Sequence, residues 1–197
     1  MEKAKSFDAL PASKADIRKF LLKKRNSLTK KQIKAKSAAI AKKLFALPEF
    51  KKAKTIFTYV SFGSEVSTKE IIKKSLSLGK TIAVPIADFK KKNLIVAKFS
   101  SFSALKKSKF GVNEPDLKKS GKVAASEIDL VIVPGVAFDM QHNRIGYGQG
   151  FYDDFLTKNP RLKNVAVAFE LQLLRKIPAT KKDRKVAKIV TEKRIVK

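Results

Sequence analysis

The run Ile128-Asp-Leu-Val-Ile-Val133 constrains the fold more than any other stretch of this sequence. It is almost continuously apolar, as a strand is when both of its faces are buried. Such strands belong to parallel sheets, because the helices that connect parallel strands cover both faces. A parallel connection also needs a crossover segment, usually a helix, before the next strand can form. The run therefore predicts an α/β fold with this strand inside the sheet.

The rest of the chain supplies strands and helices in alternation. Short apolar and β-branched runs predict further strands at 55–60, 81–85, 94–97, 165–169 and 187–190. We expect a three-layer α/β sandwich with a mostly parallel central sheet and helices on both faces. In such sheets ligands bind beyond the carboxyl ends of the strands.

Capping patterns predict where the helices begin. The pairs have capping-box spacing and precede helical periodicity: Ser13 with Asp16, Thr29 with Gln32, and Ser67 with Glu70. A further helix is expected at about 146–158, and the lysine-rich segment 105–127 is predicted to be a long surface loop. Residues 1–12 are predicted to be a flexible N-terminal tail, and residues 13–197 a single α/β domain that carries the activity.

Two scarce residue types narrow the chemistry. The chain has no cysteine and one histidine, His142. Disulfides, thiolate metal sites and cysteine nucleophiles are therefore excluded. A hydrolase that relies on a serine or cysteine activated by histidine is disfavoured.

The net charge of +28 raises the question of a nucleic-acid partner. Only seven of the 45 basic residues are arginine, and the 38 lysines are spread along the whole chain. Planar recognition of bases and phosphates favours arginine, so we interpret the charge as a general lysine bias and expect no specific nucleic acid. No stretch approaches the ~18 apolar residues of a membrane span, and the start lacks a signal-peptide core, so we expect a cytoplasmic protein without a membrane partner.

A glycine-rich segment, Arg144-Ile-Gly-Tyr-Gly-Gln-Gly-Phe-Tyr-Asp153, follows the most apolar strand. Three of the eight glycines stand here at alternate positions, which lets backbone amides approach an anion, and the next helix adds its positive end. Arg144 can clamp a phosphate and Asp153 can bind a metal ion on the phosphates. An ordinary glycine-rich turn with a helix cap remains the alternative.

Other charged residues point to the same chemistry. Seven of the 17 carboxylates fall within 114–154, which favours a Mg²⁺ site near the glycine-rich segment. Glu65 lies in the loop after the first strand, where ligand contacts concentrate. Lys14 and Arg18 share one helix face and repel each other unless an anion lies between them.

The motif Pro134-Gly-Val-Ala-Phe-Asp139, followed by the glycine-rich segment, resembles the signature of the 5-formyltetrahydrofolate cyclo-ligase family, also called 5,10-methenyltetrahydrofolate synthetases. Shorter family motifs occur in the expected order: Lys14-x-x-x-Arg18, Tyr59 before Glu65, Glu114-Pro115, Ile177-Pro178 with Asp183, and Thr191-Glu192. The sequence departs from the family pattern at Gln149, Phe151, Asp154 and Lys182.

The resemblance implies a fold related to sugar-phosphate isomerases and CoA transferases. It also implies ATP- and Mg²⁺-dependent closure of 5-formyltetrahydrofolate to 5,10-methenyltetrahydrofolate, through phosphorylation of the formyl oxygen and release of ADP and phosphate. We expect a monomer whose partners are these small molecules. The alternatives are another enzyme with a phosphate-bearing ligand on a related α/β fold, or a basic nucleic-acid-binding protein.

The resemblance further implies roles for particular residues. ATP would contact Lys14, Arg18, Arg144, Ile145, Gly146, Tyr147, Gly148, Gln149, Gly150, Phe151 and Tyr152. The folate would contact Val60, Glu65, Tyr147, Gly148, Gln149, Gly150 and Phe151. Asp153 and Asp183 would bind Mg²⁺, and Arg144, Tyr152 and Asp153 would be catalytic.

Overall fold

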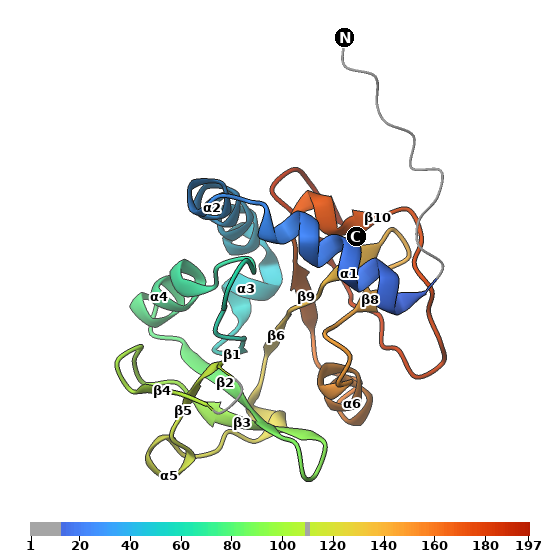
Figure 1. Ribbon diagram of the computed structural model, residues 1–197. Helices are drawn as coiled ribbons and strands as arrows, with labels where there is room; N and C mark the ends of the chain where they lie inside the picture. The colour runs from blue at the N-terminus through green and yellow to red at the C-terminus, as the bar shows by residue number, and fades with distance from the viewer. Residues whose placement is uncertain (1–12, 109–110) are drawn as a thin grey trace.

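The computed structural model describes residues 13–108 and 111–197 (Figure 1). The tail predicted at 1–12 lies outside the described residues. None of the described helices has the length and apolar character needed to cross a membrane.

A seven-stranded mixed sheet forms the centre of the fold, in the order β12-β11-β9-β6-β1-β2-β3. The five inner strands are parallel, and each of the two edge strands is antiparallel to its neighbour. The strands are β1 (Thr55–Phe57), β2 (Thr81–Asp88), β3 (Asn93–Lys98), β6 (Leu130–Val133), β9 (Asn164–Val167), β11 (Ile189–Val190) and β12 (Ile195–Val196). β6 is the middle strand and is buried along its whole length, which confirms the prediction from its apolar run.

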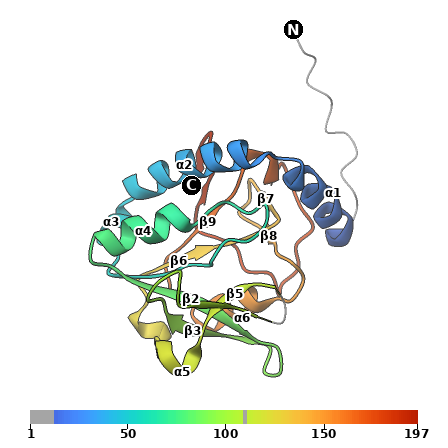
Figure 2. The same cartoon turned by 60° about the vertical axis from the view of Figure 1, so that its left-hand side comes forward.

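Helices cover both faces of this sheet, because successive side chains of a strand point to opposite faces. Ile56 and Ile132 face one core, which they share with three helices, and Phe57 and Val133 face a second core, which they share with one. The helices are α2 (Lys30–Ala46), α3 (Pro48–Lys52) and α4 (Lys69–Ser77) on the first face and α6 (Phe151–Lys158) on the second. Figure 1 shows β1, β6 and β9 between these two groups, and Figure 2 shows β6 and β9 between them from another side. A mostly parallel α/β sheet with helices on both faces is therefore confirmed.

A second, three-stranded sheet in the order β10-β7-β8 carries the first helix. Its elements are β7 (Ala137–Asp139), β8 (Arg144–Ile145) and β10 (Leu173–Leu174), and the helix is α1 (Lys14–Asn26). Ile17 and Leu21 of α1 pack against Ala137, Ile145 and Leu174 of this sheet. Because the β7–β8 hairpin follows β6 almost directly, α1 is held near the carboxyl end of the central strand.

Two helix starts follow their predicted caps. The Ser13 hydroxyl accepts a hydrogen bond from the Asp16 amide at 3.1 Å, and Thr29 and Gln32 form a complete capping box at the start of α2. The prediction that Ser67 caps α4 is wrong by one residue. Thr68 stands at that position, and its hydroxyl donates instead to the Tyr59 carbonyl at 2.7 Å.

The prediction of one long loop over 105–127 is also wrong. The segment contains β4 (Leu105–Lys107), β5 (Asn113–Pro115), α5 (Leu117–Ser120) and the 3₁₀ turn η1 (Ala125–Glu127). These elements have three or four residues each, which is too short for a periodic pattern to show in the sequence. A second 3₁₀ turn, η2 (Glu170–Gln172), follows β9.

Candidate active site

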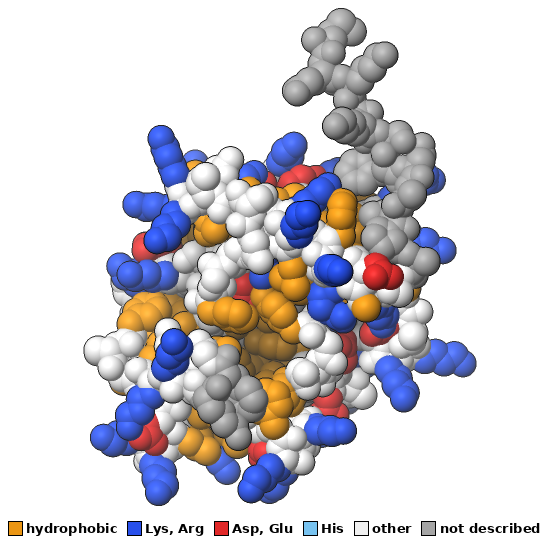
Figure 3. All heavy atoms as spheres, viewed as in Figure 1, with side chains coloured by type: hydrophobic (Ala, Val, Ile, Leu, Met, Phe, Trp, Pro, Cys, Tyr) orange, Lys and Arg blue, Asp and Glu red, His pale blue; other side chains and the backbone are white. Residues whose placement is uncertain are grey.

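A cavity of about 290 Å³ opens where the chain leaves β8 and enters α6. Its lining includes Lys14, Arg18, residues 144–153 and Asp183, so the structure gathers every residue that the resemblance assigned to ATP or to the metal. Pro134, the first residue of the family motif, and Leu94, for which the sequence analysis assigned no role, also line it. Figure 3 shows a hollow in the face seen in Figure 1, with hydrophobic side chains around it and basic side chains nearby.

The backbone of the glycine-rich loop explains its glycines. Gly148 and Gly150 have φ angles of 108° and 72°, in the region that residues with a Cβ avoid. Gly150 is also the N-cap of α6, so the loop ends where the helix presents its first free amides. At Gly146 the reason is space, because a Cβ there would lie 2.7 Å from Nη1 of Arg144.

Arg144 is buried beside this loop, and its guanidinium is only partly satisfied. Nη2 lies 2.8 Å from Oδ1 of Asp153, as a close ion pair rather than an aligned hydrogen bond, and Nη1 donates to the Pro134 carbonyl at 3.4 Å. Its Nε, and the buried hydroxyl of Tyr152, have no hydrogen-bond partner within the described part of the chain. Unpaired buried polar groups are costly, so these groups are suited to meet a ligand.

Tyr152 remains protonated beside this arginine. Burial raises the pKa of its hydroxyl far above the ordinary value, and the nearby Glu65 carboxylate adds to the increase, while Arg144 opposes it. The phenol ring stacks on Phe57, with the ring centroids 6.0 Å apart. The hydroxyl is therefore held as a hydrogen-bond donor.

Helix α1 contributes two cations to the cavity. Arg18 donates from Nε to the Gly146 carbonyl at 2.8 Å, which fixes the glycine-rich loop against the helix. Lys14 pairs with Asp183 at 2.5 Å. Burial alone would raise the pKa of Asp183, but hydrogen bonds from Lys14 and Thr180 outweigh this and lower it, so the carboxylate stays ionised.

Asp153 and Asp183 line the same cavity, and the structure links their segments. Oδ1 of Asp153 accepts a hydrogen bond at 3.1 Å from the amide of Arg184, the residue that follows Asp183. No group of three or more metal-ligating side chains occurs at 13–108 or 111–197. Mg²⁺ commonly uses one or two carboxylates together with phosphate oxygens, so the carboxylates of Asp153 and Asp183 beside the glycine-rich loop are of the type that fits this ion.

The other acidic residues of 114–154 have structural partners, and of the seven only Asp153 lines the cavity, so its proposed metal role alone stays a prediction. Asp139 is fully buried and accepts hydrogen bonds from Gln141, Asn143 and Ile177, which fixes the hairpin that carries Arg144. The remaining five lie outside the cavity lining: Glu114, Asp116, Glu127, Asp129 and Asp154.

Neither Glu65 nor Val60 lines the cavity, but Glu65 contacts the lining residue Tyr147, whereas Val60 packs against the core of the first sheet face. Glu65 is buried, and its Oε1 accepts from the Tyr147 hydroxyl at 2.9 Å, while Oε2 accepts from the Phe62 amide at 3.1 Å. Burial raises the pKa of Glu65, and these two hydrogen bonds and the charge of Arg25 reduce that shift. The rings of Phe62 and Tyr147 lie 5.7 Å apart and are partly exposed.

Arg25 is the main site-adjacent residue that the sequence analysis missed. It is buried, with 3% of its surface exposed, and contacts both Tyr147 and Ser64. A signal was present, because Arg25 stands seven residues after Arg18 and so lies on the same face of α1.

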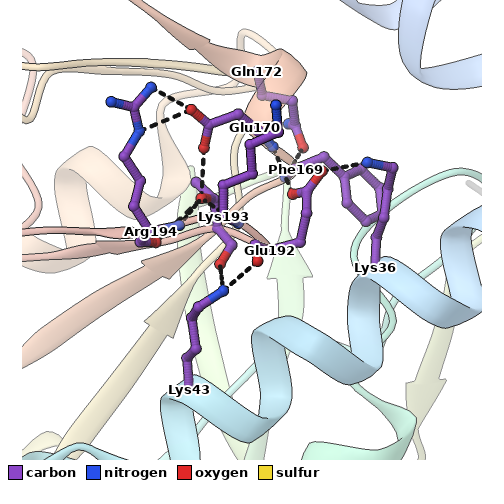
Figure 4. A network of polar contacts seen from close by, with 9 residues as sticks. Lys36, Lys43, Phe169, Glu170, Gln172, Glu192, Lys193 and Arg194 are labelled. Carbon is purple, nitrogen blue, oxygen red and sulfur yellow. Dashed lines mark hydrogen bonds and ion pairs between the residues drawn. The ribbon is translucent and has the colours of Figure 1, made fainter.

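A polar network at the carboxyl end of β9 supports the site from outside the cavity (Figure 4). Glu170 accepts hydrogen bonds from Arg194 and Thr191, and the Glu192 carboxylate accepts from the Glu170 amide and pairs with Lys36. These contacts fix η2, whose Gln172 donates to the Gly135 carbonyl at 2.8 Å. The Thr191-Glu192 motif therefore has a structural role.

Comparisons with known proteins show which family this chain resembles. The model of the 5-formyltetrahydrofolate cyclo-ligase family matches residues 11–192. The 5-formyltetrahydrofolate cyclo-ligase of Haemophilus influenzae is 32% identical over 82% of this chain and 88% of its own length. The 5,10-methenyltetrahydrofolate synthetase of Aquifex aeolicus superposes with a TM-score of 0.79 at 31% identity, over 92% of this chain and 91% of that one. The chain belongs to the 5-formyltetrahydrofolate cyclo-ligase family.

Proposed function

We propose that this enzyme, a 5-formyltetrahydrofolate cyclo-ligase, uses ATP and Mg²⁺ to close 5-formyltetrahydrofolate to 5,10-methenyltetrahydrofolate, with release of ADP and phosphate. One observation carries the proposal: the glycine-rich loop, Arg144 and the α1 cations line one cavity with two carboxylates. Anion-binding groups and metal-binding groups thus face the same space.

The chemistry explains why a nucleotide is needed. The oxygen of a formamide is a poor leaving group, and the N10 amine cannot displace it unaided. Transfer of the γ-phosphoryl group to the formyl oxygen breaks its bond to ADP and forms a carbon–oxygen–phosphorus link. N10 then bonds to the formyl carbon, the carbon–oxygen bond breaks, phosphate leaves, and the proton of N10 is lost. Phosphoryl transfer depends on positioning and charge neutralisation, so a site without cysteine or histidine suffices.

The residues of the cavity match these needs. The amides of the glycine-rich loop and of the first turn of α6 would hold phosphate oxygens, together with Lys14, Arg18 and Arg144. The unpaired Nε of Arg144 and the hydroxyl of Tyr152 are buried donors that can stabilise charge on the transferring group. Asp153 and Asp183 would hold Mg²⁺, which supplies neutralisation of phosphate charge when bound.

The folate would lie on the side of the cavity near Glu65 and Val60. The pteridine ring carries an amino group and ring N–H donors, and each oxygen of Glu65 has capacity to accept one further hydrogen bond. The partly exposed rings of Phe62 and Tyr147 offer surfaces for a flat heterocycle. Phe151, which meets Phe89 edge-on at 5.2 Å, borders the same region with the loop residues Gly148, Gln149 and Gly150.

Several further predictions accompany this function. We propose that residues 13–197 act as one catalytic domain, that the enzyme is a cytoplasmic monomer, and that it has no specific nucleic-acid partner. The proposed relation to sugar-phosphate isomerase and CoA transferase folds also stays a prediction. Family membership favours the cyclo-ligase over both alternatives, a different phosphate-ligand enzyme and a nucleic-acid-binding protein.

A coupled assay tests the proposal. The purified chain with ATP, Mg²⁺ and 5-formyltetrahydrofolate should form the near-ultraviolet absorbance of the methenyl product, with one ADP and one phosphate per product. Omission of ATP or chelation of Mg²⁺ should abolish the signal. Product without ATP consumption would contradict the mechanism, and salt-sensitive oligonucleotide binding without turnover would favour the nucleic-acid alternative.

A further inference from the structure

Arg25 joins the glycine-rich loop, which lines the cavity, to the loop after β1, which lies next to it. Its Nη2 donates to the Tyr147 hydroxyl at 2.6 Å, and its Nε donates to Oγ of Ser64 at 3.0 Å. Tyr147 belongs to the glycine-rich loop, and Ser64 precedes Glu65 in the loop after β1. One buried guanidinium therefore links the glycine-rich loop, which is proposed to contact both substrates, to the loop of Glu65, which is proposed to contact the folate.

The direction of each hydrogen bond in this network is fixed. Arginine can only donate, so the Tyr147 hydroxyl accepts from Arg25, and its single proton is directed to Glu65. The chain runs from Arg25 through Tyr147 to Oε1 of Glu65, with heavy-atom distances of 2.6 and 2.9 Å. Its three members polarise one another in the same direction, which strengthens each bond.

The position of Tyr147 makes it sensitive to both substrates. It lies among glycines, with Gly146 and Gly148 on either side, so the backbone of this loop has little intrinsic preference for one conformation. The ring of Phe62 and the Arg25–Glu65 pair hold it in place from the other side. A ligand that fixes the glycine-rich loop therefore also fixes the acceptor geometry of Glu65.

We propose that Arg25 is a positioning residue that, through Tyr147 and Glu65, couples the binding of ATP to the binding of the folate. This inference rests on the proposed function and deepens it, since it predicts that each substrate tightens the other. By linkage, the factor by which the folate increases ATP affinity must equal the factor by which ATP increases folate affinity. The coupling would favour a complex in which both reactants are present before phosphoryl transfer.

Calorimetric titration measures this coupling without turnover. The probe is the non-hydrolysable adenosine 5′-(β,γ-imido)triphosphate with Mg²⁺, titrated with and without saturating 5-formyltetrahydrofolate. For the unchanged enzyme we expect the folate to lower the Kd of the nucleotide by about fivefold or more. Tyr147→Phe removes only the connecting hydroxyl and keeps the ring, and it should reduce this factor to less than about twofold.

The variant Arg25→Met should lose the coupling to the same extent. The double variant should lose no more of the coupling than either single variant, because both changes break the same connection between Arg25, Tyr147 and Glu65. Arg161→Met is the matched control: Arg161 is exposed in the turn before β9, outside the cavity, and its change should leave the coupling factor intact.

The outcomes separate a positioning role from a merely structural one. If Arg25 only supports the fold, Arg25→Met lowers the unfolding temperature and weakens both ligands while the coupling factor survives, and the inference is overturned. Additive losses in the double variant also overturn it. Independent binding of the two ligands to the unchanged enzyme, alongside ATP-dependent turnover, refutes the coupling alone, whereas absence of ATP-dependent turnover refutes the proposed function.

Discussion

Replacement of Gly146 by alanine should impair ATP use while leaving the fold intact. The new Cβ would lie 2.7 Å from Nη1 of Arg144, and ordinary contact requires about 3.4 Å, so the guanidinium must retreat by about 0.7 Å. Arg144 cannot retreat freely, because only 4% of its side chain is exposed and Asp153 holds its other nitrogen. Displacement by about 1 Å of a group that positions a substrate can cost about 100-fold in rate.

The expected loss in kcat/KM for ATP is therefore about 10- to 100-fold, or roughly 1.4 to 2.7 kcal/mol in transition-state stabilisation. The effect on stability should be small. Because Gly146 does not have a positive φ, alanine there restricts the unfolded chain and raises the free energy of unfolding by about 0.4 to 1 kcal/mol. This gain offsets the loss from a weakened ion pair between Arg144 and Asp153. Initial rates of methenyl absorbance at varied ATP, and urea unfolding, measure the two quantities.

Gly79→Ala is the matched control with the opposite profile. Gly79 lies just after the end of α4 and has a φ of 71°. A Cβ added there would lie in open space, and the residue does not line the cavity. Alanine there should cost about 1 to 2 kcal/mol of stability through left-handed strain and leave ATP kinetics unchanged. The reasoning fails if Gly146→Ala retains full kcat/KM for ATP, or if Gly79→Ala lowers it equally.

Three further predictions address the carboxylates. Asp153→Asn should lower turnover by at least about tenfold, near 1.4 kcal/mol, and raise the Mg²⁺ concentration that the enzyme requires. The control Asp154→Asn affects only a surface ion pair with Lys158 and should change neither the turnover nor the Mg²⁺ requirement in a Mg²⁺ titration. Equal effects of the two variants would remove Asp153 from the metal site. Burial raises the pKa of Glu65, so the KM for the folate should rise as the pH falls through that raised pKa, because protonation removes a hydrogen-bond acceptor. Glu65→Gln should raise the KM for the folate at neutral pH and flatten its dependence on pH, and an unaltered pH profile argues against the assignment. Asp139→Ala should cost about 3 kcal/mol or more in urea unfolding, because buried N–H groups lose their acceptor, and a loss below about 1 kcal/mol contradicts this role.

The sequence predicted those parts of the structure whose causes are local. The caps at Ser13 and Thr29 lie within three residues of their partners, and the burial of β6 follows from its own composition. The glycine-rich loop was equally visible, because its glycines and flanking residues are contiguous. These features need no knowledge of the rest of the fold.

The remaining features depend on contacts between distant segments. Arg18 contacts Gly146 across 128 positions, and Tyr147 contacts Glu65 across 82. The hairpin that brings α1 to the cavity consists of strands of two and three residues, which carry no periodic signal. The clustering of acidic residues at 114–154 was a poor indicator of a Mg²⁺ site for the same reason, because proximity in sequence does not place their side chains in one site.

In this lysine-rich chain, the positions of the few arginines and tyrosines say more about the candidate site than the net charge does. Lysine supplies the exposed charge, since an ammonium group remains solvated at the surface. Arg18 and Arg144 instead line the cavity, and Arg25 contacts its lining residue Tyr147; Arg25 and Arg144 are buried, where a planar guanidinium can donate in several directions. Burial raises the pKa of all three tyrosines of the chain, Tyr59, Tyr147 and Tyr152, and the charge of Glu65 adds to each increase. In a chain with so strong a lysine bias, a buried arginine or tyrosine with specific hydrogen-bond partners is held in place by those contacts, and this favours the region around Tyr147 and Glu65 as the place to test the proposed substrate roles.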